Sequence, residues 1–249
     1  MSGKSLLVNF ASLDEREQFA KKVLRQRNSR CSNLKYYDTL EPRRILKKRE
    51  LTERWMQWRL SNFEYITLLN QLAGRSCNDL SQYPVFPWII LDFMSISPPD
   101  ISAIHNAPMG APNGFRDLNK NMQLLGSAER QAEFKRKYDD QDSFETIQER
   151  FHCGSHYSNP GIVLHYMSRM SPYIDALVQL HGKSLDTPDR GFHSVQESLL
   201  GALNDYADVR ELIPEFYFCP DLFLNANQVN FGQKQSGERV HDVVLPPWS

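Results

Sequence analysis

The sequence predicts a mainly α-helical fold, in which helices surround a core that contains extended, irregular segments. The first observation is a series of helix start signals followed by apolar residues at helical spacing, which indicates about five to seven helices. The second is a strongly apolar run over residues 74–90, in which Pro84 and Pro87 prevent a continuous helix. The third is that the remaining long stretches are irregular but apolar, so they are expected to be packed, with little strand.

Residues 1–29 contain one predicted strand and one predicted helix. The strand covers Ser5 to Phe10, and the helix begins at Ser12, where Glu15 completes a capping box. One strand and one helix cannot form a domain by themselves. A polar linker over residues 30–42 follows and separates them from the rest of the chain.

The next predicted helices lie on either side of a second capping box. Leu51 to Leu60 is expected to be helical, and Ser61 with Glu64 starts a helix that runs through Leu72. Gly74 is a suitable stop because glycine readily adopts the left-handed conformation that ends many helices. The side chains expected on the buried side of this helix are Phe63, Ile66, Leu68, Leu69 and Leu72.

The run from Gly74 to Ile90, GRSCNDLSQYPVFPWII, is too apolar for a surface loop and too interrupted for a helix. It is therefore expected to thread into the core in an extended form, with its buried N–H and C=O groups paired. We expect Asn78 and Asp79 to pair with the backbone around the Tyr83–Pro84 bond. The other polar side chains close enough to help are Asn70, Arg75, Ser76, Ser81 and Gln82.

Further helix starts occur in the second half of the chain, each at a Ser or Asn that can cap a helix. They are Ser127, Asn159 before Pro160, Ser171 before Pro172, and Ser194 with Glu197. Pro214 is expected to end a short helix that begins near Asp208. Residues 215–249 are rich in aromatic residues and proline, which predicts mostly irregular structure.

Basic residues are concentrated towards the N-terminus, although the net charge of the whole chain is −1. Between Arg16 and Arg59 there are 14 Lys and Arg against 5 Asp and Glu, a net charge of +9, so the remainder carries −10. The ordinary explanation is a solvated face complementary to the acidic remainder, and the alternative is contact with anionic lipid or an acidic partner. Aromatic residues do not interleave with the basic segment Pro42 to Arg49, which argues against a nucleic-acid partner.

The composition indicates a cytoplasmic protein. The cysteines, Cys31, Cys77, Cys153 and Cys219, are too scattered to suggest a disulfide framework. The start, MSGKSLLVNF, is too short and polar for a secretory signal. The longest apolar stretch is interrupted by prolines and is well short of the roughly 20 residues that span a bilayer, so any membrane contact is expected to be peripheral.

One group of residues has the spacing of a metal site. His152 and His156 could bind zinc on one face of a helix, with Cys153 beside them. Gly154 and Pro160 disfavour a helix there, and no fourth ligand is evident. We therefore expect no metal site.

Two other features could carry catalysis. A nucleophile could be Ser155 or Cys153, but the G-x-S-x-G motif is absent, and a serine next to a histidine in sequence is not a triad. Asp189–Arg190 could be an acid–base pair, although a buried structural ion pair is the stronger interpretation. We expect no catalytic residue, no cofactor and no small-molecule substrate.

The run from Gly74 to Ile90 closely resembles the central signature of the BEACH domain, which the beige/Chediak–Higashi, neurobeachin and FAN families share. Further stretches resemble motifs of this family and occur in the family's order. They are Leu51–Tyr65, Phe115–Asn119, Gly154–Pro160, Asp189–Ser194, Glu211–Tyr217 and Asp242–Trp248. The resemblance covers residues 43–249, which are identified as a BEACH domain.

This resemblance implies a BEACH-domain fold and a non-enzymatic scaffold that binds proteins in vesicle, lysosomal or autophagic membrane traffic. BEACH domains usually follow a PH-like domain and precede a WD-repeat propeller, and residues 1–29 resemble the last strand and helix of an incomplete PH-like domain. The alternative is a FAN-like signalling adaptor that couples a cytokine receptor to activation of neutral sphingomyelinase. Both roles imply protein partners and a cytoplasmic location, with peripheral association on endomembranes for the first.

The resemblance also implies which residues matter. In this family the PH-like domain packs on the BEACH domain and leaves a groove for a peptide or partner. The basic residues at that junction are Arg43, Arg44, Lys47 and Lys48. The motif residues expected to specify the fold are Asn78, Asp79, Tyr83, Pro84, Pro87, Trp88, His156, Tyr157 and Arg190.

Overall fold

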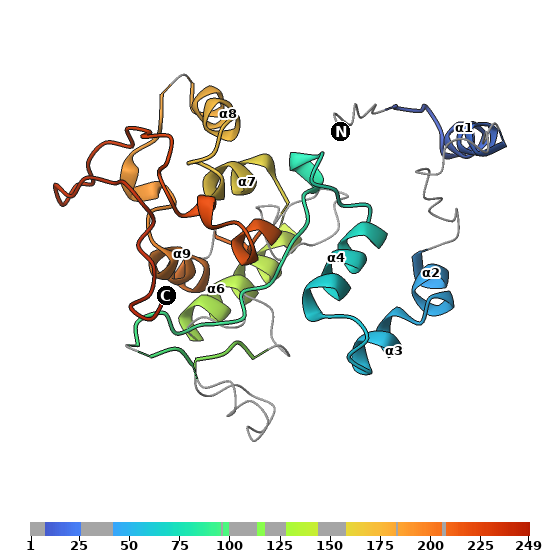
Figure 1. The fold of residues 1–249 in the computed structure, drawn as a ribbon, viewed down its shortest axis with the longest axis horizontal. Helices are drawn as coiled ribbons and strands as arrows, with labels where there is room; N and C mark the ends of the chain where they lie inside the picture. Colours follow the sequence, from blue (N-terminus) through green and yellow to red (C-terminus); the bar gives the residue numbers. More distant parts are fainter. Residues whose placement is uncertain are drawn as a thin grey trace. The chain divides into compact units, whose positions relative to one another are not determined.

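The computed structural model describes residues 8–25, 42–95, 97–99, 114–117, 128–143, 158–182, 184–205 and 208–249. These residues form α-helices and short 3-10 helices joined by irregular segments, and their extended segments pair only at isolated bridges (Figure 1). The prediction of a mainly helical fold is confirmed. The chain divides into two compact units, residues 1–73 and 74–249.

In its described residues the first unit contains the helices α1 (Leu13–Arg25), α2 (Pro42–Lys48), α3 (Leu51–Met56) and α4 (Asn62–Leu72). The α1 helix begins where predicted, because the Ser12 Oγ accepts a hydrogen bond from the Glu15 N–H at 3.2 Å. Only residues 8–10 of the predicted strand are described, and they adopt no strand. The predicted linker lies outside the described residues except for Pro42.

The start of α4 is the capping box that the sequence predicts. The Ser61 Oγ accepts from the Glu64 N–H at 3.1 Å, and the Glu64 carboxylate accepts from the Ser61 N–H at 2.9 Å. The helix stops before Gly74, whose φ of 80° is left-handed, as predicted. The predicted buried face is only partly correct, because Phe63 is 38% exposed and the buried residue of this helix is Asn70.

The described part of the second unit contains α6 (Ala128–Asp139), α7 (Pro160–Tyr166), α8 (Tyr173–Leu180), α9 (Val195–Asn204), η1 (Leu80–Gln82), η3 (Asp140–Ser143), η4 (Pro188–Arg190), η5 (Pro214–Tyr217) and η6 (Pro220–Leu222), where η marks a 3-10 helix. The cap of α7 is confirmed, since the Asn159 Oδ1 accepts from the Ile162 N–H at 3.1 Å. The cap of α9 is confirmed too, since the Ser194 Oγ accepts from the Glu197 N–H at 3.2 Å. Ser127, predicted to cap α6, lies outside the described residues.

Three predicted helix boundaries are wrong. The helix α3 ends at Met56 and not at Leu60. Pro172, not Ser171, is the N-cap of α8. Pro214 begins η5 instead of ending a helix. Its neighbour Leu212 is held extended by two backbone hydrogen bonds of 2.8 Å with Phe86, which leaves no room for a helix there. Proline has no N–H to donate, and this suits the first turn of a helix.

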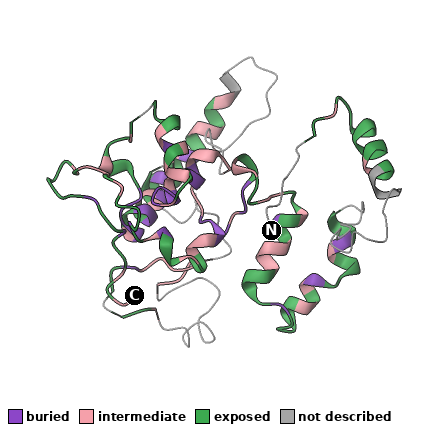
Figure 2. Cartoon of the chain, turned by 45° about the horizontal axis from the view of Figure 1, so that its top comes forward, coloured by how far each residue is buried: buried purple, intermediate pink, exposed green. Residues whose placement is uncertain are grey.

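The second unit contains a core of buried residues, coloured purple in Figure 2, and a connected group of aromatic rings lies within it and at its edge. Trp88 is fully buried, and its ring meets Phe216 edge-on with centroids 5.7 Å apart. The ring centroids of Phe216 and Phe223 are 5.2 Å apart, and those of Phe223 and Phe192 are 6.2 Å apart. The signature run therefore threads into a core made mainly of residues far along the chain, as its composition predicts.

Polar partners in the signature run differ in part from the prediction. The Tyr83 carbonyl accepts from Arg75 Nη1 at 3.0 Å, and the Gln82 carbonyl accepts from the Ser76 N–H at 2.9 Å. Asp79 caps η1 by accepting from the Ser81 N–H at 2.9 Å. Asn78 is exposed, so the expectation that its side chain pairs with the backbone at Tyr83 is wrong. The longer and charged Arg75 reaches the carbonyl instead.

None of the helices in the described ranges combines the length and the apolar character that crossing a bilayer requires.

Candidate functional site

The second unit contains a cavity of about 390 Å³. Residues of α7, α8, η4 and the segment 208–210 line it. Its apolar walls include Ile162, Leu177, Phe192, Phe231 and Val240. Its polar groups include His165, Ser168, Asp208 and Arg210. A concave space with apolar walls and a few convergent polar groups is the usual form of a binding site in proteins.

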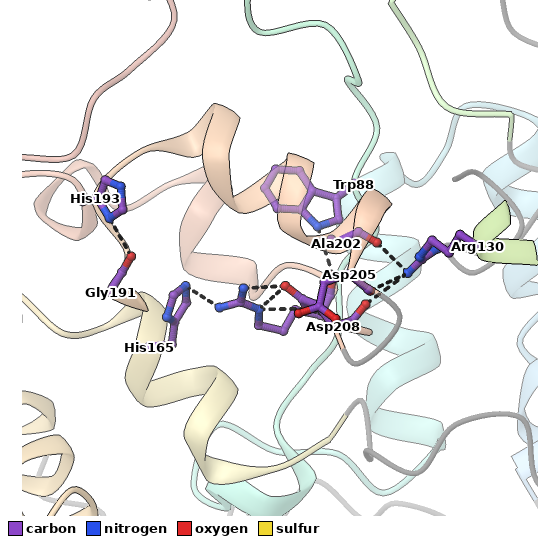
Figure 3. A network of polar contacts seen from close by, with 9 residues as sticks. Trp88, Arg130, His165, Gly191, His193, Ala202, Asp205 and Asp208 are labelled. Carbon is purple, nitrogen blue, oxygen red and sulfur yellow. Dashed lines mark hydrogen bonds and ion pairs between the residues drawn. The ribbon is translucent and has the colours of Figure 1, made fainter. Parts of the chain in front are cut away.

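Arg210 organises the polar side of the cavity. Its Nε donates to both carboxylate oxygens of Asp208 at 2.9 Å, and its Nη1 donates to the His165 Nε2 at 2.7 Å (Figure 3). Because arginine is always a donor, the His165 Nε2 must be an acceptor, so the ring proton lies on Nδ1. Burial and the neighbouring positive charge of Arg210 hold the pKa of His165 well below its usual range.

Two distant residues position the Asp208–Arg210 segment. Arg130 of α6 is buried, and its Nη2 donates to the carbonyls of Ala202, Asp205 and Asp208 at 2.8, 3.2 and 3.2 Å (Figure 3). Trp88 Nε1 donates to the Arg210 carbonyl at 3.1 Å. The fully buried indole of the signature run and a helix from the middle of the chain therefore hold this wall in place.

Another buried arginine fixes the end of α7. Arg169 is only 1% exposed, and its Nε and Nη2 donate to the His241 carbonyl at 3.0 and 2.9 Å. Its Nη1 donates to the Phe192 carbonyl, and its guanidinium lies 4.7 Å from the centroid of the Phe231 ring. Burial lowers the pKa of Arg169 to about 10. Phe192 and Phe231 both line the cavity, so Arg169 supports its shape from behind.

Ser168 carries unused hydrogen-bonding capacity. The residue is 3% exposed, lines the cavity, and its Oγ has no hydrogen-bond partner among the described residues. A buried polar group without a partner typically costs about 1–3 kcal/mol. A bound group or a water molecule in the cavity would relieve that cost.

The residues predicted to matter are spread over both units. Arg43, Arg44, Lys47 and Lys48 are all exposed on α2. Tyr83, Pro84 and Trp88 are buried and Pro87 is half-buried. His156 and Tyr157, with the metal and nucleophile candidates His152, Cys153 and Ser155, lie outside the described residues.

The expected buried pair of Asp189 and Arg190 is wrong. The Arg190 side chain is 77% exposed and pairs with Asp186 at 3.6 Å. Asp189 accepts from the Gln235 N–H at 3.1 Å and is exposed. Adjacent residues rarely point at one another, so a neighbour four positions away is the better partner for Arg190 on this tight turn.

Arg130, Arg169 and Arg210 were not predicted as site residues. One signal for Arg169 was present in the sequence, because this residue lies within the mostly apolar stretch Ile162–Met170. A charged residue in such a place needs partners if it is buried. The acceptors of Arg130 and Arg169 lie 23 to 78 positions away along the chain, and the sequence gives no local indication of them.

Comparison with known proteins agrees with this architecture. The Beige/BEACH domain family matches residues 53–249. The chain is 42% identical over 206 residues to BEACH domain-containing protein A2 of Arabidopsis thaliana. It is 39% identical over 210 residues to a putative neurobeachin homolog of Caenorhabditis briggsae. These alignments cover 82% and 84% of the chain but only 6% and 8% of the two relatives, so the chain spans less than a tenth of their length. The chain belongs to the BEACH domain family.

Proposed function

We propose that this chain is a non-enzymatic BEACH-domain scaffold that binds protein partners in vesicle, lysosomal or autophagic membrane traffic. The observation that carries the proposal is the family match over residues 53–249, within which lies the cavity with its buried Ser168 hydroxyl, for which the described residues offer no hydrogen-bond partner. The cavity suits an apolar side chain of a partner that also offers one hydrogen-bond acceptor. The proposed location is the cytoplasmic face of endomembranes.

The chemistry of the cavity favours binding over catalysis. A general base needs a free lone pair near the proton that it takes. The His165 Nε2 already accepts from Arg210, and the lowered pKa keeps the ring neutral. Asp208 is likewise engaged by Arg210. These groups hold one another in place, which suits a preformed binding site.

Blocking the mouth of the cavity tests this proposal. Thr187 lines the cavity and is exposed, so Thr187→Trp adds bulk there without disturbing the core. Gln179→Trp is the matched control, because Gln179 is exposed on the neighbouring helix α8 and is not a lining residue. The tagged proteins are captured from cells, and their partners are identified by mass spectrometry.

We expect Thr187→Trp, but not Gln179→Trp, to lose a reproducible set of trafficking proteins. A receptor complex in place of trafficking proteins would favour the signalling role. An identical partner set for both variants would remove the cavity from the proposal. Hydrolase profiling of the chain against its Ser155→Ala and Cys153→Ala variants tests the non-enzymatic role, and an activity lost in either variant would refute it.

A further inference from the structure

Trp58 is far more exposed to solvent than is usual for a large aromatic side chain. It is 84% exposed, the highest value of any large apolar residue in the described ranges, and Met56 beside it is 68% exposed. Trp55, about one turn earlier, differs from Trp58 because its side chain makes contacts within the fold. Its ring stacks on Tyr65 with centroids 4.7 Å apart, and its Nε1 donates to the Asn62 Oδ1 at 2.7 Å. Trp58 has no comparable side-chain contact among the described residues.

The backbone at Trp58 adopts a conformation that normally belongs to glycine. Its φ is 58°, in the left-handed region that a bulky side chain rarely occupies. The Trp58 N–H donates to the Trp55 carbonyl at 2.9 Å, and the Arg59 N–H donates to the Arg54 carbonyl at 2.8 Å. These two bonds form the Schellman motif that ends α3 at Met56, earlier than the predicted Leu60.

In that motif the residue after the C-cap is usually glycine, because a Cβ is unfavourable there. The fold therefore gains nothing from tryptophan at this position and loses some stability. Strained positions that persist are a reason to look for function. Here the strain directs an indole into solvent at the end of a helix.

The surroundings of Trp58 carry charge of mainly one sign. Residues 42–60 contain seven Lys and Arg against two Glu, a net charge of +5. Six of these seven basic residues are exposed, and Arg54 is half-buried. They are Arg43, Arg44, Lys47, Lys48, Arg49, Arg54 and Arg59. The helix α3, which separates the basic end of α2 from Trp58, packs against α2 and is only about 9 Å long, so the basic residues and the indole belong to one small part of the first unit.

We propose that Met56, Trp58 and the basic residues of 42–60, here named the Trp58 surface, bind an anionic lipid bilayer. Indole rings favour the interface between headgroups and acyl chains, and Lys and Arg next to them are attracted by anionic headgroups. A mainly positive surface that also presents exposed apolar side chains is complementary to a bilayer with a negatively charged surface. This proposal does not depend on the partner-binding cavity.

The substitution Trp58→Gly separates lipid binding from folding. Glycine removes the indole and relieves the left-handed strain, so the melting temperature is expected to stay the same or to rise. Binding of the full 249-residue chain is measured by sedimentation with phosphatidylcholine vesicles that contain or lack phosphatidylserine. We expect binding only with phosphatidylserine, weakening with added salt, and about tenfold weaker binding for Trp58→Gly.

Gln57→Gly is the matched control, because Gln57 is the exposed neighbour of Trp58 in the same turn and offers no apolar surface. It should bind vesicles like the wild type. The charge variant Lys47→Glu with Lys48→Glu should also lose at least about tenfold in affinity, since each Lys near an anionic membrane is worth roughly a fivefold change.

Three results would overturn the proposal. One is equal vesicle binding by Trp58→Gly and the wild type. A second is a lower melting temperature for Trp58→Gly, which would show that the indole is covered within the folded chain. A third is loss of a captured protein by Trp58→Gly with unchanged vesicle binding, which would assign the surface to a protein partner.

Discussion

The two units differ in which residues depart from the usual pattern of burial. The second unit buries the charged side chains of Arg130 and Arg169, which are 4% and 1% exposed. The first unit leaves the large apolar side chain of Trp58 84% exposed. Buried guanidinium groups are tolerated because each donates several hydrogen bonds to backbone carbonyls. An exposed indole has no such internal explanation.

This difference reflects how the backbone of each unit is arranged. In the second unit long irregular segments enter the core, so their carbonyl groups need partners that secondary structure does not supply. Arginine fills this need because one side chain carries five donors. In the first unit the described residues of α2, α3 and α4 form short helices with few buried side chains, so many of their side chains lie at the surface and are available for contacts with other molecules.

The largest expected effect tests the structural role of the buried arginines. Arg169→Ala should lower the free energy of unfolding by about 3 kcal/mol, because the His241 and Phe192 carbonyls lose their donors and Phe231 loses its packing partner. Denaturant unfolding followed by circular dichroism measures this change. Arg190→Ala, at a 77% exposed side chain, should stay within about 0.5 kcal/mol of the wild type. Equal losses of unfolding free energy in the two variants would show that the buried arginine stabilises the fold no more than the exposed one.

A second prediction uses the lowered pKa of His165. Below its ordinary pKa of about 6.5, the unfolded ring binds a proton and the folded ring does not. The unfolded state therefore binds more protons, and stability falls as the pH drops from 6.5 towards the lowered pKa, by up to about 1.4 kcal/mol per pH unit.

Unfolding curves at about pH 7.5 and about pH 5.5 measure this slope. His165→Gln keeps an acceptor for Arg210 but cannot titrate, so its slope should be shallower by one proton. His241→Gln, at an exposed histidine, is the control. A wild-type slope in His165→Gln would show that other groups carry the pH dependence.

Two serines of the second unit sharpen the comparison further. The Ser194 Oγ caps α9, so Ser194→Ala should lose about 1 kcal/mol. The Ser168 Oγ has no partner in the described part of the chain, so Ser168→Ala should be neutral or slightly stabilising. Melting temperatures of the two variants make the test. A large loss at Ser168 would indicate that an ordered water or ligand pairs with its hydroxyl.

The smallest effect is expected in the signature run. Asn78 is exposed, so Asn78→Ala should change stability by less than about 0.5 kcal/mol. Asp79→Ala should lose about 1 kcal/mol, because Asp79 accepts from the Ser81 N–H. Thermal unfolding of both variants distinguishes them, and a greater loss at Asn78 than at Asp79 would restore the role that the sequence predicts for Asn78.

Local features of the fold could be predicted and distant pairings could not. The capping of α4 by Ser61 and Glu64 depends on residues three positions apart, so the spacing alone predicts it. The same logic predicts the caps at Asn159 and Ser194. It fails at Pro214, where the pairing of Leu212 with Phe86 overrides the local signal.

The candidate cavity was beyond sequence reasoning for the same reason. Its polar wall depends on Arg130, which lies 72 to 78 positions from the carbonyls it contacts, and on Trp88, 122 positions from the carbonyl of Arg210. Trp88 could be predicted to be buried from its apolar surroundings. Its hydrogen-bond partner could not be predicted.

The sequence by itself determined where α1, α4, α7 and α9 begin, that residues 74–90 enter the core without forming an α-helix, and that the chain resembles the BEACH family. Each of these depends on residues that are close along the chain. Only the tertiary structure decided which arginines are buried, which carbonyls they serve, and that Trp58 takes a glycine-like conformation at the surface. Burial and hydrogen bonding between distant residues are properties of the assembled fold, and a charged or aromatic side chain can satisfy the same local pattern inside or outside it.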